Sequence, residues 1–299
     1  MDNILSHEDN YGINLCKTEL CPLFRSMKSN RIESIPFHVN GLNKKLKKRT
    51  NYDIFALPLN INGKNMGAIE FFSYAENIVE QNRALSVQNS LFPKELPRGV
   101  ELFFHPSNLV GGDMVFIKDE WIILFDVSGH GISSALICSG ILAILNQIVS
   151  PDLKIEDLGD ILEEKYSFFN ESEIYFTCLA VKRDGNLLNV ISFGHPAPLL
   201  SKNNDFSFIE MANDFPIGWG LEKHIRLTTE INIGDEDFLI IYTDGFTETK
   251  TKSGFIGEKG MLEIFGKTHS LKKAFITSQE MNISLFQEDD ITLLKIMPV

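Results

Sequence analysis

The sequence predicts an α+β protein in which stacked β-sheets are covered by helices, and three observations lead to this class. From Val100 onward the apolar runs are short and rich in Val, Ile and Phe, which is typical of strands. Only two segments of this region, 133–149 and 155–170, have the length and composition of helices. Strands and helices neither alternate strictly nor fall into separate blocks, which favours layers packed around a common core.

The first 75 residues predict a small antiparallel sheet. Three β-rich segments, 31–39, 51–59 and 65–73, are separated by the pairs Asn40-Gly41 and Asn62-Gly63. Asn-Gly pairs favour the tight turns that join antiparallel neighbours, because both residues tolerate positive φ. We therefore expect strands connected by hairpins in this part of the chain.

Residues 75–91 predict a helix that connects this sheet to the rest of the chain. The segment contains neither Gly nor Pro, and we expect the helix to end at Pro93. Apolar residues recur at intervals of seven, at Ile78, Leu85 and Phe92. This spacing suits one side of a parallel helix pair, although Gln81 and Gln88 occupy the alternate positions of that seam. A helix packed on its own domain is an equally good interpretation.

The charge distribution supports a domain boundary near residue 75. Residues 1–75 contain ten Lys or Arg against seven Asp or Glu, whereas the whole chain of 299 residues has a net charge of −12. The chain is also longer than one typical domain of roughly 100–200 residues. We therefore expect a small module at 1–75, a linker helix at 76–98 and a large domain at 99–299.

Composition and charge argue against several classes of partner. The acidic region beyond residue 75 would repel nucleic-acid phosphates, and the basic run 44–49 is more typical of a solvated strand or turn. A weaker alternative gives that run a nucleic-acid role. No stretch approaches the roughly 18 apolar residues of a membrane helix, and the acidic start does not resemble a signal peptide. We therefore expect no membrane contact. Because the four cysteines are few and scattered, we also expect a reducing, cytoplasmic location.

Aspartates at the ends of apolar strands form the candidate functional site. They occur in "VGGDMV", "WIILFDVSGHG", "FLIIYTDGFTE" and "EDDITLLKI", at Asp113, Asp126, Asp244, Asp289 and Asp290. Converging carboxylates repel one another unless a cation neutralises them, and their oxygens are the ligands that Mg²⁺ and Mn²⁺ prefer. If these residues meet in the fold, they predict a metal site. Alone, each motif is weak evidence, because an Asp followed by Gly after a strand, as in "TDG", is also typical of an ordinary turn.

A series of motifs occurs in order along residues 88–299. It comprises "VGGD", "DVSGHGISSAL", "FTCLAV", "GNLLNVISFGHPAPLL", "FPIGW", "GDEDFLIIYTDGFTET" and "EDDITLL". This series resembles the SpoIIE-type (stage II sporulation protein E) branch of the PPM metal-dependent serine/threonine phosphatases. The resemblance implies an α-β-β-α layered sandwich, in which two packed antiparallel β-sheets are flanked by helices, and hydrolysis of phosphoserine or phosphothreonine on a protein.

The resemblance also implies a role for each matching residue. Asp126 would bridge two metal ions, Mn²⁺ or Mg²⁺, and activate water. The carboxylate of Asp113 and the backbone carbonyl of Val127 would complete the coordination of one ion. Asp244 and Asp289 would hold the other ion.

Further residues would surround these ligands. Asp290 would support them without touching a metal, and Gly112 and Gly129 would either let the backbone approach the ions closely or form sharp turns. His130 is the candidate general acid for the leaving alkoxide, because His titrates near neutrality, although a solvated or capping role is more common after a loop glycine. Ser133 is the expected cap of the following helix.

The segments "LPL", "NGK" and "GAIEFFS" of the N-terminal module resemble the later part of a PAS sensor domain. The leading hypothesis is therefore a signalling phosphatase that is regulated by this module. The family resemblance implies an anti-anti-sigma-factor (STAS-like) protein as substrate, and the linker helix is a candidate contact for a homodimer. The alternative is a non-catalytic module that keeps the phosphatase fold and binds a phosphoprotein. Without a Gly-rich nucleotide loop, kinase and dehydrogenase functions are not expected.

Overall fold

In the computed structural model the chain forms two compact units, Met1–Asn82 and Arg83–Val299, and the division falls within helix α2 (Ile78–Leu91). The structure describes residues 5–8, 21–31, 33–34, 39–43, 48–61, 64–74, 78–107, 110–129, 131–172, 174–219, 225–284 and 287–299. Within these ranges no helix is long and apolar enough to cross a lipid bilayer.

The smaller unit is an antiparallel sheet with one short helix, α1 (Pro22–Ser29). Its strands are β1 (Leu5–Glu8), β2 (Glu33–Ser34), β3 (Val39–Asn43), β4 (Lys48–Ile61) and β5 (Lys64–Tyr74). The prediction of a turn at Asn40-Gly41 is wrong, because both residues lie inside β3 and pair with β4. The pair Asn62-Gly63 lies outside the described residues, but Ile61 pairs with Lys64, so β4 and β5 are adjacent antiparallel strands as expected.

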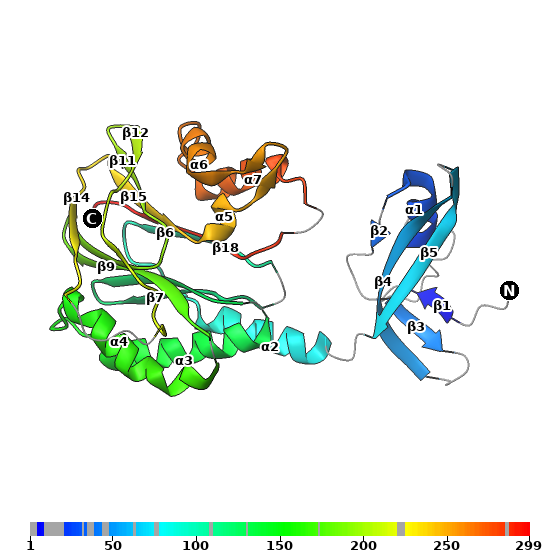
Figure 1. The fold of residues 1–299 in the computed structure, drawn as a ribbon, viewed down its shortest axis with the longest axis horizontal. Helices are drawn as coiled ribbons and strands as arrows, with labels where there is room; N and C mark the ends of the chain where they lie inside the picture. The colour runs from blue at the N-terminus through cyan, green and yellow to red at the C-terminus, as the bar shows by residue number, and fades with distance from the viewer. Residues whose placement is uncertain are drawn as a thin grey trace. The chain divides into compact units, whose positions relative to one another are not determined.

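The larger unit contains two large β-sheets, besides one two-stranded hairpin (Figure 1). The first sheet has the order β13-β10-β9-β8-β7, with β14 beside β10, and the second has the order β12-β11-β15-β18-β6. The strands of the first sheet are β7 (Asp113–Lys118), β8 (Trp121–Val127), β9 (Phe176–Asp184), β10 (Leu187–Phe193), β13 (Asn213–Asp214) and β14 (Thr229–Asn232). Those of the second are β6 (Val100–His105), β11 (Leu199–Lys202), β12 (Asp205–Phe208), β15 (Phe238–Tyr242) and β18 (Ile291–Ile296). The pairing is antiparallel except for the short parallel pair of β10 with β13.

Strand β8 shows why the sheets are sandwiched between helices. Its side chains alternate between two cores: Ile122 and Leu124 join the core between the sheets, whereas Ile123 and Phe125 join the core under the helices. A strand that is apolar on both faces must be covered on both, which explains its unbroken hydrophobic sequence.

Helices cover the outer face of each sheet (Figure 1). Helices α3 (Ile132–Ile148) and α4 (Leu158–Tyr166) pack on the first sheet, and α6 (Gly257–Phe265) and α7 (Leu271–Met281) pack on the second. A short helix, α5 (Asp244–Thr247), and the hairpin of β16 (Lys250–Thr251) and β17 (Gly254–Phe255) follow β15. The predicted α-β-β-α sandwich is therefore confirmed.

The two predicted helical segments of this unit differ in detail from the structure. The segment 155–170 is divided into α4 and the flanking 3₁₀ turns Ile155–Asp157 and Ser167–Ser172. The prediction that Ser133 caps α3 is wrong, because the cap position is Gly131 and no side chain caps this end. Ser133 instead lies inside the first turn of the helix.

Candidate active site

The hairpin of β7 and β8 places two of the aspartates next to each other. Asp113 begins β7 and pairs directly with Asp126 near the end of β8. Directly opposed residues of an antiparallel pair project from the same face of the sheet. A single hairpin therefore brings Asp113 and Asp126 together, although they are 13 residues apart in the sequence.

The second sheet supplies the other aspartates. Asp244 follows β15 at the start of α5, and Asp289 and Asp290 precede β18, the neighbour of β15. Thr243 and Thr292, on these neighbouring segments, both donate hydrogen bonds to Oδ2 of Asp113, at 2.7 and 2.6 Å. These bonds link the aspartates of the two sheets into one cluster.

Burial and mutual repulsion raise the pKa values of these carboxyl groups. Burial, and then the charge of Asp290, raises the pKa of Asp113 well above its ordinary value. Burial likewise raises the pKa of Asp126, to which Asp113, Asp244, Asp289 and Asp290 add. The pKa of Asp244 rises to about 6, through burial and then the charges of Asp289 and Glu248. The cluster therefore resists carrying its full negative charge.

The donor chemistry of the cluster fits a divalent cation. Oδ1 of Asp244 is buried without a hydrogen-bond partner, although a buried polar atom is normally paired. Asp113, Asp126 and Asp244 form no ion pair with any residue in the described part of the chain. As placed, no three Asp, Glu, His or Cys side chains among the described residues surround a common point closely enough to hold an ion. Carboxylate oxygens without a positively charged partner are nevertheless the ligands that Mg²⁺ or Mn²⁺ prefers, and such an ion would neutralise their negative charge.

Asp290 holds the backbone that leads to Asp113. Its Oδ1 accepts hydrogen bonds from the backbone N–H and hydroxyl of Ser107, and its Oδ2 accepts one from the N–H of Gly112 at 2.7 Å. Both oxygens are thus engaged with protein donors. This differs from Asp126, whose carboxylate accepts no hydrogen bond from the described residues.

Gly112 allows a close approach of backbone to the cluster. A Cβ at this position would lie 2.6 Å from the carbonyl oxygen of Val127 and 3.2 Å from Oδ1 of Asp126. The Val127 carbonyl and the Asp126 carboxylate therefore both face Gly112. Gly129 differs, because a Cβ there would meet nothing within 4 Å, and its φ of +90° indicates a turn instead.

Two further side chains fix the Gly111-Gly112 segment. Gln88 of α2 is buried and makes a reciprocal pair of bonds with Gly111: its Nε2 donates to the carbonyl at 2.8 Å, and its Oε1 accepts from the N–H at 3.0 Å. Cys138 of α3 donates from Sγ to the Gly112 carbonyl at 3.0 Å, and burial raises the pKa of this thiol well above its usual range.

Sequence reasoning missed several residues of this region, and His130 lies outside the described residues. The supporting residues are Gln88, Ser107, Cys138, Thr243 and Thr292. Thr243 could have been noticed because it precedes Asp244 in "YTDG". The others carry no local signal, since their partners are between 23 and 183 residues away in the chain.

Residues 118–297 match the protein family described as Stage II sporulation protein E (SpoIIE). The phosphoserine phosphatase RsbP of Bacillus subtilis (strain 168) is 24% identical over a match that covers 49% of this chain and only 39% of that relative's length.

Solved structures share the fold. The SiaA-PP2C domain of Pseudomonas aeruginosa matches with a TM-score of 0.60 at 18% identity, over 73% of this chain and 95% of that domain. The PP2C phosphatase domain of SpoIIE from Bacillus subtilis, solved with a fragment of its regulatory domain, matches with a TM-score of 0.56 at 10% identity, over 82% of this chain and 79% of that one. The family match extends over more than half of the chain, from the last residue of β7 to just beyond the end of β18. The chain therefore belongs to the SpoIIE family, and its larger unit has the fold of PP2C phosphatase domains.

Proposed function

We propose that this chain hydrolyses phosphoserine or phosphothreonine on a small signalling protein, with the help of two bound Mn²⁺ or Mg²⁺ ions. The observation that carries the proposal is the cluster of buried carboxylates from both sheets, in which Asp244 has an oxygen without a partner. A phosphatase domain that had lost catalysis would have no use for such mutual repulsion.

Each member of the cluster has a separate task in this proposal. Asp126 would serve both ions, Asp113 and the Val127 carbonyl would hold one of them, and Asp244 and Asp289 would hold the other. Asp290 positions the backbone before Asp113 through Ser107 and Gly112. Bound ions would supply polarisation of the phosphoryl oxygens and a water of lowered pKa as attacking group.

The test is phosphate release from a phosphoserine peptide and from an aryl phosphate in the presence of Mn²⁺. We expect release by the native chain and only background release by Asp126→Ala and Asp244→Asn, because each removes a ligand from the cluster. Asp119→Asn is the matched control, since Asp119 is exposed in the turn between β7 and β8 and belongs to no part of the site. A native chain that binds the phosphopeptide but releases no phosphate would favour the alternative, a non-catalytic binding module.

The finer substrate assignment rests on the family resemblance. We propose an anti-anti-sigma-factor (STAS-like) phosphoprotein, and the chain is similar to a phosphoserine phosphatase, RsbP. Loss of one phosphate from such a protein, followed by mass spectrometry, would test this assignment. An unchanged mass under conditions in which the phosphoserine peptide is hydrolysed would contradict it.

We further propose that the N-terminal module, for which a PAS-like fold is the sequence-based expectation, regulates the site through α2. The support is the contact of Gln88 with Gly111, two residues before Asp113, because any displacement of α2 would pull on this segment. A homodimer contact through α2 would have to use a different side of the helix, where Val87 is exposed. His130 remains the proposed general acid.

A further inference from the structure

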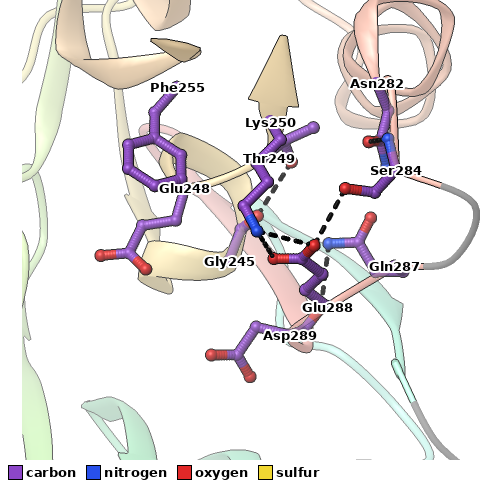
Figure 2. Close-up of a pocket in the computed structure, with 10 residues that line it drawn as sticks. All are labelled: Gly245, Glu248, Thr249, Lys250, Phe255, Asn282, Ser284, Gln287, Glu288 and Asp289. Carbon is purple, nitrogen blue, oxygen red and sulfur yellow. Dashed lines mark hydrogen bonds and ion pairs between the residues drawn. The ribbon is translucent and has the colours of Figure 1, made fainter.

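A pocket of about 270 Å³ lies beside the aspartate cluster (Figure 2). Its walls come from the end of α5, the β16–β17 hairpin, the segment after α7 and the segment before β18. Asp289 lines it, and so does Gly245, which follows Asp244, so the pocket adjoins the proposed metal site. It is smaller than the roughly 300–1,000 Å³ pockets that hold drug-sized ligands, and its size suits a single side chain.

Lys250 is the one cation among the described residues that line this pocket, and it is already paired. Lys250 donates to Glu288 at 2.9 Å, and Ser284 donates to the same carboxylate at 3.0 Å. The N–H of Ile283 donates to the carbonyl of Lys250, which joins the segment after α7 to the hairpin. Lys250 is therefore part of the wall, and an acidic group entering the pocket would have to displace Glu288.

Glu248, by contrast, has no partner of opposite charge. Its carboxylate accepts no hydrogen bond and forms no ion pair within the part of the chain that the structure describes. Glu248 lies one helical turn after Asp244, whose carbonyl accepts the Glu248 N–H at 2.7 Å, and its charge adds to the rise in the pKa of Asp244. The pocket therefore offers an unneutralised negative charge next to the position where the phosphate is hydrolysed.

An exposed aromatic ring lies on the same side of the pocket as Glu248. Phe255 is 58% exposed and lines the pocket together with Glu248, and Figure 2 draws the two side chains on the same side of the view. A carboxylate beside an aromatic face attracts an ammonium or guanidinium group, because the ring face carries partial negative charge. The apolar stem of Lys or Arg can also pack along such a ring.

We propose that this pocket binds a Lys or Arg side chain of the phosphoprotein substrate, and that Glu248 and Phe255 set this preference. The proposal rests on the proposed phosphatase function. The phosphorylated residue binds at the aspartate cluster, and a basic residue close to it in space enters the pocket. Glu248 is thus a specificity residue and not a ligand of the metal ions.

The experiment compares matched phosphoserine peptides that carry Lys or Ala at each position flanking the phosphoserine. With the full native chain and Mn²⁺, we expect kcat/KM to be roughly three- to tenfold higher for Lys at one or more positions. In Glu248→Gln the Lys-to-Ala ratio falls close to one, and in Phe255→Leu it falls part of the way. In the control Glu263→Gln, an exposed position on α6 outside the pocket, the ratio is that of the native chain. The native ratio also decreases with added salt, since screening weakens the ion pair.

Three outcomes are informative against the proposal. Equal kcat/KM for Lys and Ala peptides in the native chain overturns it, and so does a Glu248→Gln variant that keeps the native ratio. A Glu248→Gln variant that needs more Mn²⁺ for half-maximal activity but keeps the ratio assigns Glu248 to the metal site instead. In all three the phosphatase function survives, whereas a chain that hydrolyses none of the peptides refutes the proposed function itself.

Discussion

Two threonine hydroxyls decide which oxygen of Asp113 is open to a ligand. Thr243 and Thr292 both donate to Oδ2, and Oδ1 accepts no hydrogen bond within the described ranges. The hydroxyl of Thr243 also accepts the N–H of Thr292 at 2.9 Å, so the three residues orient one another. A carboxylate held in this way has one oxygen fixed by protein and one directed to other partners.

Replacement of Thr292 by Val should weaken metal binding without emptying the core. Val keeps the shape of the buried side chain but removes one donor to Asp113. We expect the Mn²⁺ concentration for half-maximal phosphate release to rise about 10- to 100-fold, as is usual when a partner of a ligand is lost. Thr229→Val on β14 is the control, because this hydroxyl makes no hydrogen bond in the described structure. It should leave the Mn²⁺ concentration for half-maximal phosphate release unchanged. A native-like Mn²⁺ dependence in Thr292→Val would contradict this role.

The sequence singles out the aspartates, whose metal-binding role stays a prediction, but it carries no comparable signal for the residues that support them. Asp244 and Asp126 stand out because each ends a hydrophobic strand and belongs to an ordered series of motifs. Thr292 does not, since a buried Thr in "ITLLKI" has the same pattern as any strand residue. The cap of α3 was predicted wrongly because Ser133 satisfies the residue preference of a cap, whereas the backbone turn at Gly131 determines where the helix begins.

At the scale of elements, α2 has a double attachment to the rest of the larger unit. Gln88 uses both ends of its amide on Gly111, so the helix and the segment before Asp113 are fixed to each other. The sequence left two interpretations of this helix open: one side of a helix pair with Gln88 on its seam, or a helix packed on its own domain. The burial of the Gln88 amide within the unit favours the second, which the heptad spacing alone could not distinguish because both interpretations need one inward-facing stripe.

Replacement of Gln88 by Ala should lower phosphatase activity by loosening this attachment. The variant leaves the buried N–H and C=O of Gly111 without partners, a loss of about 1–3 kcal/mol per group in local stability. We expect kcat/KM for a phosphoserine peptide to fall, and the melting temperature of the larger unit to fall by several degrees. Asn89→Ala, at the exposed neighbouring position, is the control. Unchanged activity in Gln88→Ala would remove the support for regulation through α2.

At the scale of the whole molecule, the buried His195 makes the stability of the larger unit sensitive to acid. Burial lowers the pKa of His195 from 6.5 to about 3, and its Nδ1 shares a hydrogen bond of 3.0 Å with the hydroxyl of Thr177. The unfolded chain takes up a proton on this residue as the pH falls below 6.5, but the folded chain does not. His195 therefore contributes stability that is present above its unfolded pKa and is lost progressively as the pH falls towards 3.

His195→Gln should flatten this pH dependence. Between pH 7 and pH 5 the native chain should lose about 2 kcal/mol more of its free energy of unfolding than the variant. Tryptophan fluorescence during urea unfolding is the appropriate measurement, because both tryptophans of the chain, Trp121 and Trp219, lie in the larger unit. Comparison with the variant cancels the titration of Asp244, which acts in the opposite direction. Parallel pH profiles for the two proteins would contradict the prediction.

The layered architecture was the most predictable property of the molecule. The length and the apolar composition of each strand can be read from a short local segment such as β8. The N-terminal pair Asn40-Gly41 was predicted wrongly because its conformation depends on pairing with a distant strand and not on the local sequence. It fits a turn by residue preference, but pairing of β3 with β4 on either side of it keeps the backbone extended.

The direct pairing of Asp113 with Asp126 also limits insertions and deletions in the connection between β7 and β8. Side chains of a strand alternate between faces, so the insertion or deletion of one residue in the tight connection at Asp119-Glu120 would shift the pairing of β7 against β8 by one position. One of the two carboxylates would then point into the apolar layer on the far side of the sheet. Length variation in evolution should therefore be excluded from this short connection, even though it is exposed and far from the chemistry.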